Sequence, residues 1–303
     1  MKTLCVVHLI RAQNGIEPFV RFLDSYHQNN GGIDHDILFL FKGFDLPSSK
    51  DEHLRLLAPI QCITYDIPDT GFDITAYFAV AKRYGGEYRY FCFLNSYSVI
   101  QDRKWLSKLY AQISLPEVGL VGATGSWQSH RGNALYWRLP FGIAIKHFKE
   151  NREKNVINRV ILGITFAWQQ SRFLMNYDQF PNYHLRTNAF MISGELMRML
   201  ESLPMATKLD TYKFESGRNG LTRQILKTGK KVIVVGKDGK GYEMQHWNES
   251  QTYWQDEQQN LLVSDNQTRD YQHAGADRRN YLSSVAWGNK AIRLKINAKQ
   301  RRN

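Results

Sequence analysis

The sequence predicts an α/β protein whose mainly parallel central sheet is flanked by helices and carries a helical insertion. Through the first 125 residues, short apolar runs typical of buried strands alternate with stretches of helical spacing. Such alternation favours parallel strands joined by crossover helices. With 43% hydrophobic residues among 303, the chain can bury a large core. A basic and aromatic stretch interrupts the alternation between residues 126 and 180.

The expected elements begin with a β-α-β-α-β pattern. Strands are expected at 4–10, 36–41 and 61–65, with helices at 18–26 and 48–57 between them. A helix after Asp73, a strand at 90–94, a helix at 105–113 and a strand at 119–122 follow. One or two amphipathic helices are expected within 126–179. The remaining expectations are a strand at 185–192, a helix at 195–202, a helix at 221–227 that Gly229 ends, and a strand at 231–235.

The net charge and the cysteines indicate which kinds of partner the protein binds and in which cellular compartment it is expected. The net charge of +12 favours anionic partners such as nucleotide phosphate, anionic lipid or nucleic acid. No nucleic-acid-binding module is recognisable, so nucleic acid is not expected. The three cysteines lie within or beside apolar runs, which is typical of reduced thiols in a cytoplasmic protein. No apolar run is long enough to predict a membrane-spanning helix.

Polar residues follow three of the expected strands, where the ligands of such sheets bind. After the strand at 90–94 come Asn95, Ser96, Tyr97 and Ser98; after the first strand, Arg11 and Asn14; after the third, Asp66, Asp69, Gly71 and Asp73. An aspartate at this edge can hold a ribose or a base, and a helix start can meet a phosphate. Asp73 is alternatively a helix N-cap. His8 lies inside an apolar run and is expected to be a core residue.

Several common motifs are absent. The chain has no Walker-type Gly-Lys-Ser/Thr, no G-x-G-x-x-G after the first strand and no His-Glu-x-x-His. A nicotinamide enzyme is thereby disfavoured, and no Cys/His spacing suggests structural zinc.

Four segments carry a resemblance to a known family. The run DTGFDITAYFAVAKRYGGEYRYFCFLNSYSVI resembles the part of GT-A glycosyltransferases that ends in their D-x-D metal motif. The runs FPNYHLRTNAFMISGELM, KFESGRNGLTRQILKTGKKVIVVGKDG and LLVSDNQTRDY are similar to bacterial surface-polysaccharide glycosyltransferases of the rhamnan or O-antigen type. The resemblance covers most of the chain. It implies a GT-A-like, Rossmann-type fold and a hexosyl- or deoxyhexosyltransferase that moves a sugar from a nucleotide-diphosphate donor to a glycan or lipid-linked acceptor, with inversion expected.

The chain departs from this family at the metal motif. The positions of D-x-D hold Asn95, Ser96, Tyr97 and Ser98, none of which carries a carboxylate. Mg²⁺ or Mn²⁺ is therefore disfavoured, because a hard cation needs anionic oxygen ligands beside a diphosphate. The favoured expectation is that arginines neutralise the donor diphosphate, namely Arg11, Arg186, Arg218 or Arg223. Alternatively the metal sits elsewhere, or the chain has become a non-catalytic nucleotide- or glycan-binding protein.

The resemblance also implies roles for later residues. Glu215 is expected to be the catalytic base, with Asp210 in reserve; alternatively Glu215 only favours a helix N-terminus through its charge. His184, Arg186, Thr187 and Asn188 are expected to form an acceptor or phosphate wall; alternatively Asn188 is a buried polar residue whose hydrogen bonds are satisfied. His246 and Trp247 are expected to close over a sugar, or else to be packing residues. Asp265 to Thr268 are expected to form a turn.

Four segments follow from this assignment. Residues 1–125 form the nucleotide-sugar-binding half, 126–180 the basic aromatic helical insertion, 181–260 the acceptor-binding and catalytic half, and 261–303 a C-terminal segment with a basic tail. The insertion is either a flap or acceptor platform beside an anionic membrane or two ordinary helices with a solvated basic face. The expected location is the cytoplasm or the periphery of the inner face of the plasma membrane.

Overall fold

The computed structural model describes residues 2–45, 47–131, 155–202, 205 and 207–289. An eight-stranded sheet forms its centre, in the order β11-β10-β6-β9-β4-β1-β2-β3. Its strands are β1 Lys2–Arg11, β2 Asp36–Lys42, β3 Ile63–Ile67, β4 Tyr88–Leu94, β6 Val118–Gly122, β9 Ala189–Ser193, β10 Lys231–Val235 and β11 Gly241–Glu243. β9 is antiparallel to both β4 and β6, and β11 is antiparallel to β10. The other pairs are parallel, which confirms the α/β class and the mainly parallel sheet.

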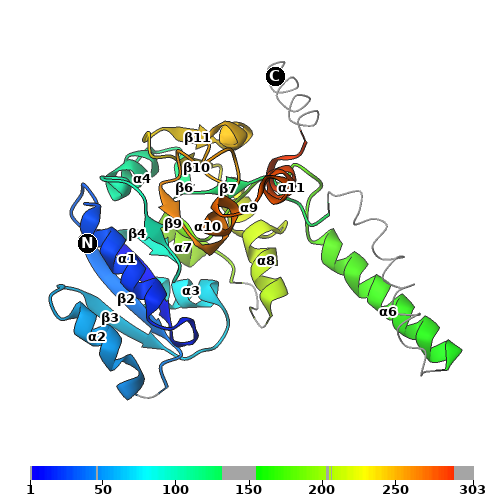
Figure 1. Ribbon diagram of the computed structural model, residues 1–303, viewed down its shortest axis with the longest axis horizontal. Helices are drawn as coiled ribbons and strands as arrows, with labels where there is room; N and C mark the ends of the chain where they lie inside the picture. The colour runs from blue at the N-terminus through cyan, green and yellow to red at the C-terminus, as the bar shows by residue number, and fades with distance from the viewer. Residues whose placement is uncertain (1, 46, 132–154, 203–204, 206, 290–303) are drawn as a thin grey trace.

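Helices cover both faces of the sheet (Figure 1). α1 Glu17–Gln28, α2 Asp51–Leu57 and α4 Trp105–Ile113 pack on one face. α3 Asp73–Tyr84, α7 Gly194–Met199, α8 Lys208–Ser216 and α9 Leu221–Lys227 pack on the other. Residues of β1 alternate between the two cores, with Val7 in one and Val6 in the other, because successive side chains of a strand point to opposite faces.

Shorter elements complete the chain. Two small pairs join β5 Val99–Ile100 to β12 Val263–Ser264 and β7 Gly125–Ser126 to β8 His184–Leu185. The 3-10 turns are η1 Ala12–Asn14, η2 Pro47–Lys50 and η3 Met244–Glu249. The remaining helices are α6 Val156–Met175, α10 Asn266–Gln272 and α11 Ala276–Trp287.

Most expected elements are confirmed, and two differ. The strand expected at 185–192 is two strands, β8 and β9, separated by residues 186–188. The helix expected at 48–57 begins as the 3-10 turn η2 before α2. Of the two helices considered for the insertion, α6 is described, whereas 132–154 and the basic tail at 290–303 lie outside the described residues.

Several local expectations are also decided by the structure. Gly229 follows the end of α9 with φ of 76°, the left-handed conformation that glycine adopts most readily. Asp73 is the first residue of α3 and caps nothing, so the N-cap interpretation is wrong. Glu215 lies at the C-terminal end of α8, so its alternative role at a helix N-terminus is wrong as well. Cys5, Cys62 and Cys92 are free thiols, and within the described residues no helix is long and apolar enough to cross a bilayer.

Candidate functional site

The segments after β1, β4 and β6 meet the residues between β8 and β9 at one edge of the sheet. β1 and β4 are parallel, so their carboxyl ends lie side by side. The backbone oxygen of Asn188 accepts hydrogen bonds from the Asn95 N–H at 2.9 Å and the Ser98 hydroxyl at 3.2 Å. The break between β8 and β9 is thereby fixed against the turn that follows β4.

That turn, residues 95–98, is closed by its own side chains. Asn95 Oδ1 accepts from the Tyr97 N–H at 3.1 Å and from the Ser98 hydroxyl at 3.0 Å. Asn14, the last residue of η1, donates to Ser96 Oγ at 2.8 Å and accepts from the Tyr97 hydroxyl at 3.1 Å. Asn14, Asn95, Ser96 and Ser98 are therefore brought together as expected from the strand order.

A divalent cation does not fit this turn. The turn has no carboxylate, and the Asn95 side-chain oxygen already accepts two hydrogen bonds. Among the described residues, no three His, Cys, Asp or Glu side chains are grouped so as to hold a metal.

A second cluster lies between the ends of β1 and β2 and the start of α3. Lys42 Nζ donates to Asp69 Oδ1 and to the Gly71 carbonyl oxygen, both at 2.8 Å. Arg11 lies 3.3 Å from Asp69 and 3.8 Å from Asp73. The hydrogen bond from Lys42 lowers the pKa of Asp69, whereas burial raises the pKa of Asp73 despite the nearby Arg11. Arg11, Asp69, Gly71 and Asp73 are therefore brought together at this edge of the sheet.

Asp66 lies apart from this cluster. It is exposed on the edge strand β3 and pairs with Lys50 at 2.6 Å.

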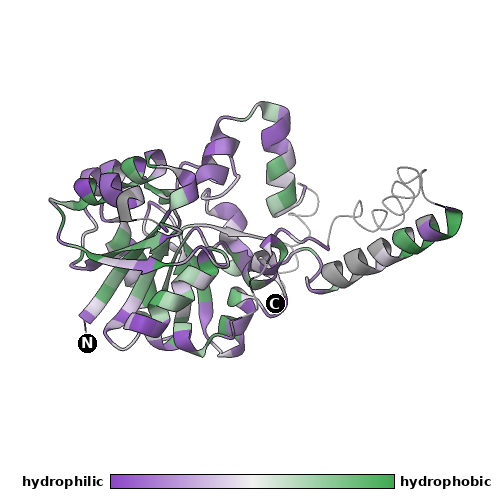
Figure 2. Ribbon diagram, turned by 90° about the horizontal axis from the view of Figure 1, so that it is seen from below, coloured by the Kyte–Doolittle hydropathy of each residue, from purple (hydrophilic) through white to green (hydrophobic). Residues whose placement is uncertain are grey.

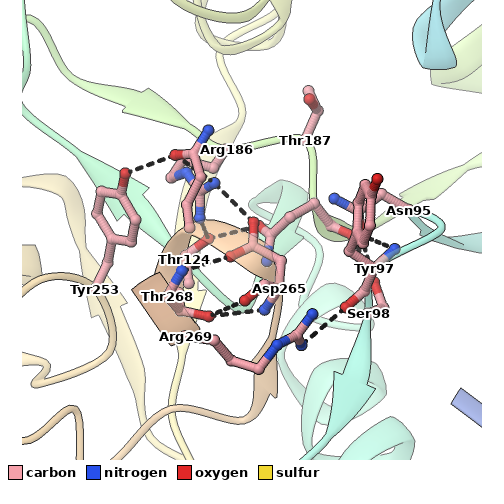
Figure 3. A network of polar contacts seen from close by, with 12 residues as sticks. Asn95, Tyr97, Ser98, Thr124, Arg186, Thr187, Tyr253, Asp265, Thr268 and Arg269 are labelled. Atoms are coloured by element: carbon pink, nitrogen blue, oxygen red, sulfur yellow. Dashed lines mark hydrogen bonds and ion pairs between the residues drawn. The ribbon is translucent and has the colours of Figure 1, made fainter. Parts of the chain in front are cut away.

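A buried ion pair joins the β8–β9 break to α10 (Figure 3). Arg186 lies 2.7 Å from Asp265, donates to Gln267 at 3.0 Å and stacks over the Tyr253 ring at 4.2 Å. Burial alone would raise the pKa of Asp265, but the charge of Arg186 and the hydrogen bonds from Arg186 and Thr268 together outweigh it and hold that pKa below its ordinary value. The positive charge of Arg186 is therefore largely neutralised by the Asp265 carboxylate.

Asp265 has a second role that the sequence analysis missed. Its carboxylate caps α10 by accepting from the Thr268 N–H at 2.9 Å, and Thr268 returns a capping contact, accepting from the Asp265 N–H at 2.7 Å. Aspartate is among the residues preferred at a helix N-cap, so Asp265 is a signal for a helix start. The sequence analysis expects only a turn there.

The other arginines expected to neutralise phosphate are also paired. Arg218 and Arg223 lie 3.0 and 2.8 Å from the two carboxylate oxygens of Asp178. Together with Arg11 and Arg186, all four arginines therefore share their charge with a carboxylate.

Glu215 faces a cavity of about 280 Å³ beside this network. Glu215 Oε1 accepts from the Thr187 N–H at 2.8 Å and from the Thr187 hydroxyl at 3.4 Å. The cavity is lined by Ser126, Gln128, His130, His184, Arg186, Tyr212, Glu215, Ser216, Tyr253, Trp254, Gln267, Asp270, Arg278 and Leu282. A half-buried carboxylate is thus held by one oxygen among aromatic, imidazole and amide side chains.

Asp210 does not share this cavity. It forms a capping box with Thr207 at the start of α8, pairs with Lys213 at 3.1 Å, and lines a separate depression of about 390 Å³ beside Arg218.

Two cavity histidines are held neutral at pH 7. Burial lowers the pKa of both His184 and His130 to about 4. His184 Nδ1 lies 2.9 Å from the Asn182 carbonyl oxygen. Because a carbonyl only accepts, Nδ1 carries the proton and Nε2 is left as a hydrogen-bond acceptor. His130 was missed by the sequence analysis, since nothing near it in sequence marks it.

The other residues expected to bind the acceptor, Asn188, His246 and Trp247, lie in different environments. Asn188 is buried, and its Oδ1 accepts from Thr124 at 2.6 Å, while its Nδ2 has no partner among the described residues. His246 is exposed on η3 and lies 3.4 Å from Glu249. Trp247 is fully buried and donates to the Tyr242 carbonyl oxygen at 2.9 Å, so the packing interpretation holds for it and its ring is not accessible to a sugar.

No family model and no curated protein matches the chain. Among solved structures it is similar to apo mouse xyloside xylosyltransferase 1, with 11% identity over 77% of this chain and 84% of that one and a TM-score of 0.39. It is similar to 4-diphosphocytidyl-2C-methyl-D-erythritol synthase from Anaerococcus prevotii, with 11% identity over 77% and 88% of the two chains and a TM-score of 0.43. A third structure, GalNAc-T7 with UDP, GalNAc and Mn²⁺, has 14% identity over 39% of this chain and 22% of that one and a TM-score of 0.32. These likenesses concern the arrangement of the main chain alone.

Proposed function

We propose that the protein is an inverting glycosyltransferase of the surface-polysaccharide type, which moves a sugar from a nucleotide-diphosphate donor to a glycan or lipid-linked acceptor without a divalent metal. The placement of Glu215 carries this proposal. Its carboxylate is half-buried, fixed through one oxygen by Thr187, and faces a cavity large enough for a sugar unit.

The chemistry requires one base. In inverting transfer an acceptor hydroxyl oxygen bonds to C1 of the sugar as the bond from C1 to the phosphate oxygen breaks, and the hydroxyl proton passes to the base. Glu215 Oε2 has no hydrogen-bond partner among the described residues, so it is available for that proton. Trp254, which is half-buried and stacks on the buried Tyr253 with the ring centroids 4.5 Å apart, supplies aromatic surface on which a sugar can pack.

The donor diphosphate needs a positively charged side chain that is not already paired with a carboxylate. Arg269 of α10 donates to the Tyr97 carbonyl oxygen at 3.1 Å, directly beneath the turn that replaces D-x-D (Figure 3). Across the described parts of the chain, no carboxylate lies within ion-pair distance of its guanidinium. Arg269 thus fits the diphosphate better than the four paired arginines, because a guanidinium can hold two phosphate oxygens at once. Asn14, Asp69, Asp73 and Asn95 would line the nucleoside side of the same edge.

The Glu215→Gln variant tests the base. The amide keeps the size of the side chain and an oxygen for the Thr187 N–H, but it cannot take a proton at neutral pH. Transfer from the preferred nucleotide sugar should fall by roughly 10²- to 10⁴-fold, whereas the Kd of the nucleotide should change little. The measurement is steady-state transfer together with calorimetric nucleotide binding.

Unchanged turnover in Glu215→Gln would contradict the role of Glu215. Nucleotide or glycan binding by the wild-type chain with no transfer or donor hydrolysis would instead favour a non-catalytic binding protein.

A further inference from the structure

Arg186 is a buried cation in the wall of the Glu215 cavity, and Asp265 is the carboxylate that pairs with it. The two charged groups are 2.7 Å apart, and Arg186 and Asp265 are only 7% and 1% exposed. Burial by itself would lower the pKa of Arg186, but the charge of Asp265 raises it above its ordinary value, with smaller contributions that include Glu215. Glu215 is therefore a second carboxylate whose charge acts on Arg186.

The two carboxylates differ in how their oxygens are occupied. Asp265 Oδ1 accepts from the Thr268 N–H at 2.9 Å, and its Oδ2 accepts from Arg186 (Figure 3). Glu215 Oε1 accepts from the Thr187 N–H, and its Oε2 has no hydrogen-bond partner among the described residues. Both oxygens of Asp265 are thus occupied, whereas Glu215 keeps one oxygen open.

Contacts with uncharged groups complete the surroundings of Arg186. Its Nη2 donates to Gln267 Oε1 at 3.0 Å, its Nη1 donates to Thr124 Oγ1 at 3.4 Å, and its Cζ lies 4.2 Å from the centroid of the Tyr253 ring. The described part of the insertion is not involved, because α6 extends away from the sheet in both views (Figures 1 and 2). Within the described ranges, Asp265 is the one carboxylate at ion-pair distance from Arg186.

We propose that Asp265 is a positioning residue for the base: it holds the Arg186 guanidinium, so that Glu215 Oε2 stays free to take the acceptor proton. The inference rests on the proposed function for what Glu215 does with that oxygen. Without the Asp265 carboxylate, a buried guanidinium would lack an anionic partner, which is strongly unfavourable. Glu215, in the wall of the same cavity, would then pair with Arg186, and a guanidinium can occupy both oxygens of a carboxylate at once.

Three variants of the full chain test this role. Asp265→Asn removes the charge but keeps an oxygen for the Thr268 N–H, because asparagine caps helices as well as aspartate does. Arg186→Gln combined with Asp265→Asn removes both charges and leaves a neutral pair. Asp66→Asn is the control, since it makes the same change at a paired aspartate on the edge strand β3, outside the cavity.

The measurement is the carboxylate ¹³Cδ resonance of Glu215 in protein labelled with ¹³C-glutamate, identified by its loss in Glu215→Gln. At neutral pH, Asp265→Asn should move this resonance, because Arg186 then pairs with Glu215. The double variant and the control should keep it at the wild-type position. Transfer measured in parallel should fall by at least roughly tenfold in Asp265→Asn, and the double variant should be faster than Asp265→Asn alone.

An unmoved Glu215 resonance in Asp265→Asn would overturn the proposal. A shift that persists in the double variant would overturn it too, because the cause would then be packing and not the charge of Arg186. Both variants are expected to fold, since Glu215 supplies the missing partner in one and the other buries no charge at this pair; loss of the folded circular dichroism spectrum in either contradicts the proposal. Absence of transfer by the wild type would refute the proposed function, but the resonance would still report on Asp265.

Discussion

His8 lies inside β1, and its ring stacks on Phe22 with 3.7 Å between ring centroids. Neither ring nitrogen has a hydrogen-bond partner among the described residues, and burial lowers the pKa of His8 to about 3. The sequence predicted this core position because His8 falls within an apolar run. Together with His130 and His184 it makes three histidines whose folded pKa lies well below the ordinary value.

These shifts predict a loss of stability on acidification. The unfolded chain binds a proton at each histidine near pH 6.5, but the folded chain does so only near pH 3 to 4, so unfolding takes up protons between these values. Stability should therefore be fully present above pH 6.5 and fall as the pH drops toward 4, by up to about 1.4 kcal/mol per pH unit for each histidine. His8→Phe should flatten this fall in thermal unfolding, whereas His27→Phe, at an exposed position of α1, should leave it unchanged. If the stability of the wild type and of His8→Phe falls equally as the pH drops, then His8 does not contribute to the loss of stability in acid.

Charge pairing is a residue-scale property that the sequence did not reveal. Arg186 and Asp265 are 79 positions apart, and Arg11 pairs with carboxylates more than 50 positions away. A linear pattern identifies arginines near a ligand edge, but it does not say which carboxylate each arginine meets. For this reason Arg269 is not among the arginines that the sequence predicts to bind phosphate.

At the scale of elements, the sequence predicted strands and helices better than their interruptions. The apolar run at 185–192 has the composition of one strand, yet the chain breaks at Arg186, Thr187 and Asn188 to satisfy partners from three other segments. Tertiary hydrogen bonds override local propensity there. The break is also what places the Thr187 N–H against Glu215.

Each of the two capping boxes contains a threonine, Thr268 at the N3 position of α10 and Thr207 at the N-cap of α8. Thr268 is fully buried at the start of α10, whereas Thr207 is exposed at the start of α8. Thr268→Val keeps the shape but leaves the buried Asp265 N–H without its acceptor, so the free energy of unfolding should fall by about 1–3 kcal/mol. Thr207→Val should lower it by about 1 kcal/mol, the usual cost of losing an N-cap hydroxyl, because water reaches the exposed N–H groups. Urea denaturation of both variants measures the two losses, and an unchanged stability in Thr268→Val would mean that the buried Asp265 N–H does not depend on the Thr268 hydroxyl.

For the whole molecule, alternation of strands and helices was enough to predict the class of the sheet but not its full order. The run from β1 to β4 follows the expected parallel pattern, since local crossovers dictate it. β9 lies between β4 and β6 in the sheet, although it follows β6 by almost seventy residues in the sequence. It runs antiparallel to both. That insertion brings Glu215 and the Arg186 pair to the edge formed by the first half, and no periodicity in the sequence specifies it.

The assembled edge predicts how the whole protein responds to its donor. A ligand present at a hundredfold excess over its Kd stabilises the folded state by about 2.7 kcal/mol, enough to raise the Tm by several degrees. In a thermal-shift screen of UDP-, GDP-, dTDP- and CMP-sugars, one donor should raise the Tm equally in EDTA and in Mn²⁺, because the turn at 95–98 has no carboxylate to hold a metal. Arg269→Gln should remove most of that rise, whereas Arg83→Gln, an equal loss of charge on the exposed end of α3, should keep it. A rise that requires Mn²⁺ and survives Arg269→Gln would mean that the donor brings its own cation, and the guanidinium beneath the turn would then serve only to hold Tyr97 in place.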